Sequence, residues 1–84
     1  MSYTVNDRIR MSMKLLGMTQ KQMASHTGIP AWRISDIANN KGRVTANELG
    51  RIASALQIPL DCLVKQIPLF DKLFDYYNYQ VWKK

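Results

Sequence analysis

The chain contains few of the residue types from which catalytic and metal sites are built. It has one cysteine, Cys62, one histidine, His26, and only six acidic residues among 84. A single cysteine excludes an internal disulfide. One histidine with scattered carboxylates and no phosphate-binding loop provides no catalytic constellation. We therefore expect no enzymatic activity, no cofactor and no bound metal.

Long apolar runs are also missing. No stretch approaches the roughly 20 apolar residues that a membrane span requires, and the N-terminus has no signal-peptide pattern. There are no repeats and no Gly/Ser linker, and 84 residues suffice for one small domain. These absences favour a cytoplasmic protein without a membrane partner.

The small number of acidic residues leaves the chain strongly basic. Twelve Lys or Arg residues against six Asp or Glu give a formal net charge of +6. An excess of this size favours a polyanionic partner, although many small soluble proteins share it.

The middle of the chain has the pattern of two short helices joined by a tight turn. Ala24, Gly28, Ile34 and Ile37 follow one another at offsets of four, six and three residues. Gly28 can adopt the positive φ that a helix C-terminus before a sharp turn requires. Pro30 can open the next helix, because a missing N–H costs nothing there. Ile34 and Ile37 then share the face that closes over the first helix of the pair.

Caps and breakers predict three further helices around this pair. After a short arm of residues 1–5, Asn6 is the expected N-cap of a first helix that ends at Gly17. Thr19 with Gln22, and Thr45 with Glu48, form capping boxes for the second and fourth helices. The second helix should end near residue 27, the third should cover about 30–38, the fourth should break at 58–59, and a fifth should cover 60–64.

This order of motifs resembles the phage repressor and Cro family of XRE-type helix-turn-helix proteins over residues 7–64. The segments 17–20 and 53–63 carry the resemblance beyond the helix pair. It implies an all-α fold with five helices in a DNA-binding domain of residues 1–64, and a C-terminal extension of residues 65–84. It further implies binding to double-stranded DNA, with the third helix in the major groove.

The outward face of the third helix is expected to read bases through Ala31, Trp32, Arg33, Ser35 and Asp36. By resemblance, Ala31, Trp32 and Asp36 match positions that face base edges. We expect Trp32 to be exposed, since Ile34 and Ile37 define the inward face; the alternative is a core aromatic. Asp36 would hold Arg33, which would bond guanine O6 and N7; the alternative for Asp36 is to accept a hydrogen bond from cytosine N4. The alternative for Arg33 is a solvated or phosphate-bound side chain.

Contacts to the DNA backbone are expected from Gln20, Lys21, Asn39, Asn40, Lys41 and Arg43. Gln20 begins the second helix, where free N–H groups and the helix dipole favour an anion. Residues 39–43 form a polar loop after the reading helix; a merely solvated loop is the alternative. Four other cations are expected to be largely solvated, namely Arg8, Arg10, Lys14 and Arg51.

One departure from the family pattern concerns a buried ion pair. Many members pair an arginine on the first helix with a glutamate at the end of the third, and the matching positions here are Met13 and Ala38. Because both charges are absent together, no orphan charge remains. An apolar replacement of such a pair can be neutral or stabilising.

The C-terminal extension carries six of the eight aromatic residues. After Pro68, apolar residues at 70, 73, 74, 77 and 81 have the spacing of one helical stripe, while a strand over 76–81 is the alternative. We expect this stripe to form a dimer interface through Phe70, Leu73, Phe74, Tyr77 and Trp82. Packing on the protein's own core and binding of another protein are the alternatives.

Two functions are compatible with these features. The first is a Cro-like transcriptional repressor that binds a palindromic operator as a homodimer. The second is an antitoxin that autoregulates through the same DNA-binding core while the aromatic tail binds a toxin. A toxin gene beside this one would favour the second.

Overall fold

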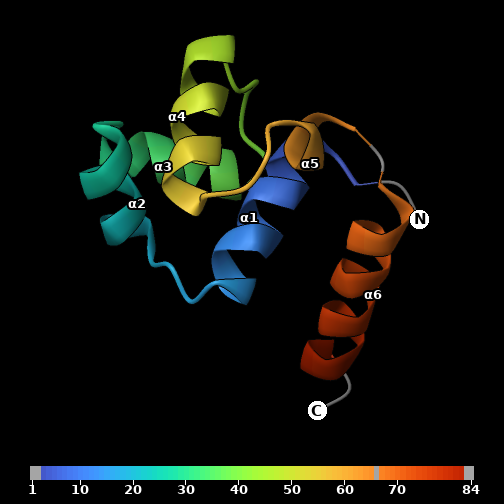
Figure 1. Cartoon of the computed structure of the whole chain (residues 1–84). Helices are drawn as coiled ribbons and strands as arrows, with labels where there is room; N and C mark the ends of the chain where they lie inside the picture. Colours follow the sequence, from blue (N-terminus) through green and yellow to red (C-terminus); the bar gives the residue numbers. More distant parts are fainter. Residues whose placement is uncertain (1–2, 66, 83–84) are drawn as a thin grey trace.

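The computed structural model describes residues 3–65 and 67–82, and within these residues the chain forms six helices and no strand (Figure 1). The all-α fold is therefore confirmed, and the tail is a helix rather than a strand. The helices are α1 (Val5–Leu15), α2 (Gln20–Thr27), α3 (Ala31–Ala38), α4 (Ala46–Leu56), α5 (Asp61–Val64) and α6 (Pro68–Trp82).

The start of α1 differs from the prediction. Thr4, not Asn6, is the N-cap: the Thr4 hydroxyl accepts a hydrogen bond from the Asp7 amide at 3.0 Å, and the Asp7 carboxylate accepts one from the Thr4 amide at 3.2 Å. This reciprocal box satisfies two free N–H groups, whereas a cap at Asn6 would satisfy one. Asn6 lies in the first turn and is 7% exposed. The helix ends near the expected position, with Leu16 as C-cap and Gly17 following at φ 68°.

The two predicted capping boxes are both present. Thr19 pairs with Gln22 at the start of α2, and Thr45 pairs with Glu48 at the start of α4. In each box the threonine side chain accepts from the backbone three residues on, and the Gln or Glu side chain accepts from the threonine N–H. Local side-chain chemistry therefore fixes where these two helices begin.

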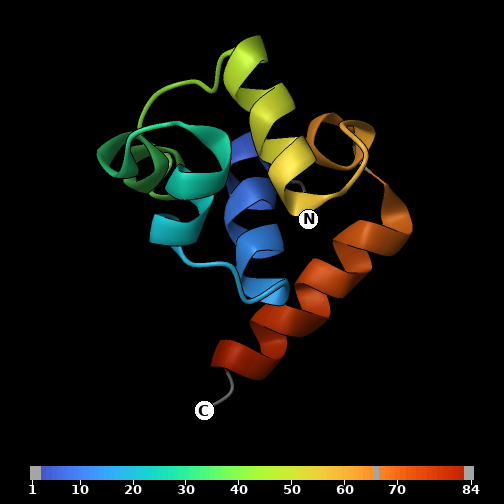
Figure 2. The same ribbon diagram turned by 60° about the vertical axis from the view of Figure 1, so that its left-hand side comes forward.

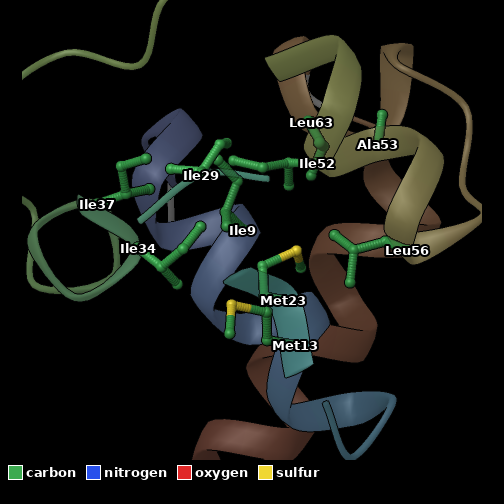
Figure 3. Close-up of a cluster of buried hydrophobic side chains, with 10 residues drawn as sticks. All are labelled: Ile9, Met13, Met23, Ile29, Ile34, Ile37, Ile52, Ala53, Leu56 and Leu63. Carbon is green, nitrogen blue, oxygen red and sulfur yellow. The ribbon is translucent and has the colours of Figure 1, made fainter. Parts of the chain in front are cut away.

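The main core lies where α1 to α5 converge (Figure 3). Its buried members are Ile9, Met13, Met23, Ile29, Ile34, Ile37, Ile52, Ala53, Leu56 and Leu63. Full burial of an Ile, Leu or Met side chain contributes about 1.5–3 kcal/mol to the stability of the fold. Met13 and Ala38 are both buried, so apolar side chains occupy the two positions where the family often places its ion pair.

The helix α6 packs on α1 on the side away from α2 and α3 (Figures 1 and 2). Phe74 is fully buried in a second cluster with Tyr3 and Met11, and its ring meets that of Tyr3 edge to face at a centroid distance of 5.7 Å. The Tyr3 hydroxyl also donates to Asp75. The assignment of Phe74 to a dimer interface is therefore wrong, because the side chain has no surface left for a partner.

An ion pair between buried Arg8 and half-buried Asp71 reinforces this contact between α1 and α6. The Arg8 guanidinium lies 3.2 Å from the Asp71 carboxylate and also donates to the Tyr3 carbonyl. Arg8 is 3% exposed, so the expectation that it is solvated is wrong. Residue 3, placed by the sequence in a terminal arm, is likewise part of the packed structure. No helix among the described residues has the length and apolar character needed to span a membrane.

Candidate DNA interface

The turn between α2 and α3 is held by hydrogen bonds and by one buried side chain. The Thr27 hydroxyl donates to the Met23 carbonyl at 2.7 Å and accepts from the Ile29 amide at 3.1 Å. Gly28 has φ 76°, and Ile29 is 5% exposed within the core. Pro30 is the N-cap of α3. The chain therefore reverses between two helices whose mutual position is fixed by packing.

The helix α3 has one buried face and one outward face. Ile34, Ile37 and Ala38 are buried. At about 100° per residue, Trp32 lies on the opposite side of the helix from these three side chains. Trp32 is 67% exposed, which confirms the prediction that it is not a core aromatic. An exposed tryptophan on a helix whose other face is anchored is available to a large partner.

The remaining outward positions differ in exposure. Ala31, in the first turn, is exposed, while Ser35 and Asp36 are half-buried. The Ser35 hydroxyl accepts a hydrogen bond of 3.3 Å from the Asn39 side chain. The first turn of α3 is thus the most accessible part of the predicted base-reading face.

The predicted backbone-contacting residues are all on the surface. Exposed side chains occur at Gln20, Lys21, Asn39, Asn40, Lys41 and Arg43. Gln20 and Lys21 form the start of α2, where the first backbone N–H groups have no partner inside the helix. The other four lie at the end of α3 and in the loop that follows it. The two groups therefore come from the beginning of one helix and the end of the other.

The loop after α3 has a fixed backbone despite its polar sequence. Asn40 adopts φ 61°, and the Lys41 amide donates to the Asp36 carbonyl at 2.8 Å. The Asn6 side chain donates to the carbonyls of Ile37 at 3.1 Å and Gly42 at 3.2 Å. Asn6, whose predicted capping role is wrong, thus connects α1 to this loop.

Arg33 provides a second anchor for the loop. Its Nε and Nη2 donate to the two carboxylate oxygens of Glu48 at 2.8 and 2.9 Å, and Nη2 donates to the Arg43 carbonyl at 2.6 Å. The expectation that Asp36 holds Arg33 is wrong: the partner is Glu48 on α4, 15 residues away. A fork of two parallel bonds to one carboxylate is the strongest common geometry for this pair.

The electrostatics of this pair follow from its geometry. The hydrogen bond from Arg33 lowers the pKa of Glu48 to about 2 against the opposing effect of desolvation, and the Thr45 amide contributes in the same direction. The same bond raises the pKa of Arg33 above its usual value. Glu48 therefore caps α4 and holds Arg33 at once, and its charge is retained throughout the neutral range.

Sequence reasoning missed the residues that support the surface rather than form it. Thr4 was detectable, since a threonine three residues before an aspartate is a capping signal. The contacts of Asn6 and Glu48 had no local signal, because their partners lie 31 to 36 and 15 residues away. The exposed residues were easier to predict because helical periodicity alone separates them from the buried face.

A comparison with protein families agrees with this geometry. A family model described as Helix-turn-helix matches residues 9–61, well over half of the chain. The chain belongs to the XRE-type helix-turn-helix family. The predicted resemblance to Cro and phage repressors is thereby confirmed, and this XRE-type protein is a DNA-binding transcription regulator. The matching family is one of DNA-binding domains. No curated protein and no solved structure matched the chain.

Proposed function

We propose that this XRE-type protein is a transcriptional repressor that binds a palindromic operator as a homodimer, with α3 in the major groove. The observation that supports it best is the exposed Trp32, on the face of α3 opposite buried Ile34 and Ile37. The major groove admits an α-helix and displays a distinct pattern for each base pair. An anchored helix with an accessible first turn suits that task.

The side chains divide into three roles under this proposal. Base edges would be met by Ala31, Trp32, Ser35 and Asp36, and DNA phosphates by Gln20, Lys21, Asn39, Asn40, Lys41 and Arg43. Arg33 takes a positioning role, because its guanidinium already serves Glu48 and the loop backbone. Phosphate contacts fix the orientation of a protein on the duplex, whereas base contacts specify the sequence.

The dimer would form through the outer face of α6. Leu69, Leu73 and Tyr76 are 80%, 50% and 62% exposed, and their spacing of four and three residues places them on one side of the helix. Asp71 and Phe74, which hold α6 to α1, lie on the opposite side. An anchored helix with an apolar outer stripe is a surface that self-association would cover.

Neighbouring surface supports the same assignment. Leu60, the N-cap of α5, and Val64, its last residue, are 46% and 41% exposed. Two copies related by a two-fold axis would present two α3 helices to half-sites about 34–36 Å apart.

The side chains of the other expected interface residues, Phe70, Tyr77 and Trp82, lie outside those that the structure describes. The proposed division is a DNA-binding domain of residues 1–64 and an extension of residues 65–84.

Selection of bound sites from random duplex DNA tests this function. We expect enrichment of a palindrome whose half-sites are about one helical turn apart. Light scattering on the free protein should give the mass of two chains. Enrichment of a single asymmetric half-site, together with a monomer mass, would refute the dimer, and no enrichment at all would refute sequence-specific binding.

The antitoxin alternative uses the exposed face of α6 for a different partner. Leu73→Asp distinguishes the two, because this side chain is half-exposed and its replacement leaves the buried face of α6 intact. A repressor dimer should dissociate and lose operator affinity. In the antitoxin case, the variant would remain dimeric and bind the operator as before.

A further inference from the structure

We infer that the first turn of α3 selects thymine methyl groups, so that operator half-sites carry A·T pairs where this turn meets the base edges. The inference rests on the proposed function, since it requires α3 to lie in the major groove. It concerns Ala31 and Trp32, the two side chains of that turn that are exposed.

The arginine nearest to this turn, Arg33, is bonded within the protein. An arginine that bonds guanine O6 and N7 is the commonest specific contact in the major groove. Arg33 directs its Nε and Nη2 donors to the two carboxylate oxygens of Glu48 and to the Arg43 carbonyl, so two of its three guanidinium nitrogens are already bonded within the protein. Releasing the guanidinium would leave Glu48 without its cationic partner and free the loop backbone. The turn therefore lacks a free pair of guanidinium nitrogens for the bidentate contact that would favour guanine.

The two exposed side chains of this turn, Ala31 and Trp32, are largely apolar. Ala31 presents only a methyl group, and Trp32 presents a large apolar ring with a single N–H donor. Among the four bases, only thymine has an apolar group at its major-groove edge. A guanine beneath this surface would have its O6 and N7 acceptors shielded from water with at most one donor available, and an unsatisfied buried acceptor is costly. An apolar turn thus favours thymine and disfavours guanine.

The preference for thymine is confined to the first turn of α3. Asp36 lies more than one turn further along α3, is half-buried, and can accept a hydrogen bond from cytosine N4. A G·C pair is therefore compatible with the position that Asp36 faces. The preference for thymine applies to the base pairs met by the N-terminal end of the helix.

The test replaces thymine by deoxyuridine in the selected operator, which removes only the 5-methyl group. Each methyl in contact with the turn should contribute about fourfold in affinity, which corresponds to about 0.8 kcal/mol for a buried carbon of this kind. Replacement of thymines outside the half-sites serves as the control and should have no effect. Equal affinity for the thymine and deoxyuridine half-sites would overturn the inference.

Two variants connect the effect to Trp32. Trp32→Ala should abolish the difference between thymine and deoxyuridine at one position, while Trp32→Phe should preserve much of it because the apolar ring is kept. Circular dichroism should show both variants folded, since the side chain is 67% exposed. A thymine preference unchanged in Trp32→Ala would overturn the assignment of that residue.

A probe of guanine separates the remaining outcomes. Operators with 7-deazaguanine in the half-sites lack the N7 acceptor, and we expect no loss of affinity that depends on Arg33. A loss that disappears in Arg33→Ala would show that this arginine reads guanine and would overturn the inference. Selected sites with G·C pairs under the first turn would overturn it too, yet leave the proposed function standing. Only a failure to select any site would overturn both.

Discussion

The ion pair between Arg33 and Glu48 allows a perturbation that removes one charge and little else. In Glu48→Gln the side chain keeps its size and an oxygen that can accept from the Thr45 amide, so the cap of α4 is preserved. What is lost is the charge that holds Arg33 by two hydrogen bonds. The variant therefore tests the pair separately from the helix start.

The size of the effect follows from the position and pKa of Glu48. A carboxyl group whose pKa falls from 4.5 to about 2 gains at most about 3 kcal/mol of folded-state stabilisation. Solvent reaches both side chains at the surface and screens the pair, so we expect about 1–2 kcal/mol at pH 7. For a domain of this size, each kcal/mol shifts the melting temperature by about 4–8 °C.

The pH dependence of the stability difference between wild type and Glu48→Gln tests this account of the ion pair. Because the folded-state pKa is lowered, the stabilisation is complete above the unfolded pKa of 4.5 and disappears as the pH falls toward 2. Thermal unfolding followed by circular dichroism should give wild type a higher melting temperature than Glu48→Gln at pH 7. This difference in melting temperature should disappear between about pH 5 and 2. A gap of the same size at pH 2 and pH 7, or none at pH 7, would refute this account.

Four further outcomes are expected. Lys41→Ala should weaken binding to all DNA sequences and lower the slope of log affinity against log salt by about 0.9; an unchanged slope would show that it contacts no phosphate. Phe74→Ala should cost about 3–5 kcal/mol in unfolding experiments because it empties a fully buried site, whereas Leu73→Asp should yield a folded monomer by light scattering; a folded dimer would contradict the α6 interface. In a Trp82→Phe background, the fluorescence of Trp32 should change on operator binding, and a signal indifferent to DNA would place this residue outside the interface.

How much was predictable depended on the distance between partners along the chain. The capping boxes at Thr19 and Thr45 and the turn at Gly28 were predicted, because each signal lies within a few residues. The role of Arg33 was not, because a closer carboxylate at Asp36 competed in the sequence with the true partner 15 residues away.

The tail shows a different limit. The spacing of its apolar residues predicted a helix, and the structure contains one. The same spacing did not predict which side of that helix faces the rest of the protein. Leu73 and Phe74 are adjacent in sequence and about 100° apart around the helix. One is half-exposed and the other fully buried. Which of the two side chains is buried depends on the position of α1, whose Arg8 and Met11 face α6.

The contacts of Tyr3 with α6 have a consequence for the order of folding. The Tyr3 hydroxyl and Asp75 are separated by 72 residues, whereas α2 and α3 are neighbours in sequence. Contacts between distant segments close large loops and form late, while local ones form early. We expect the helix-turn-helix to assemble before α6 docks. Under the proposed α6 interface, a refolding molecule would then be able to bind DNA weakly as a single copy before it can pair with another.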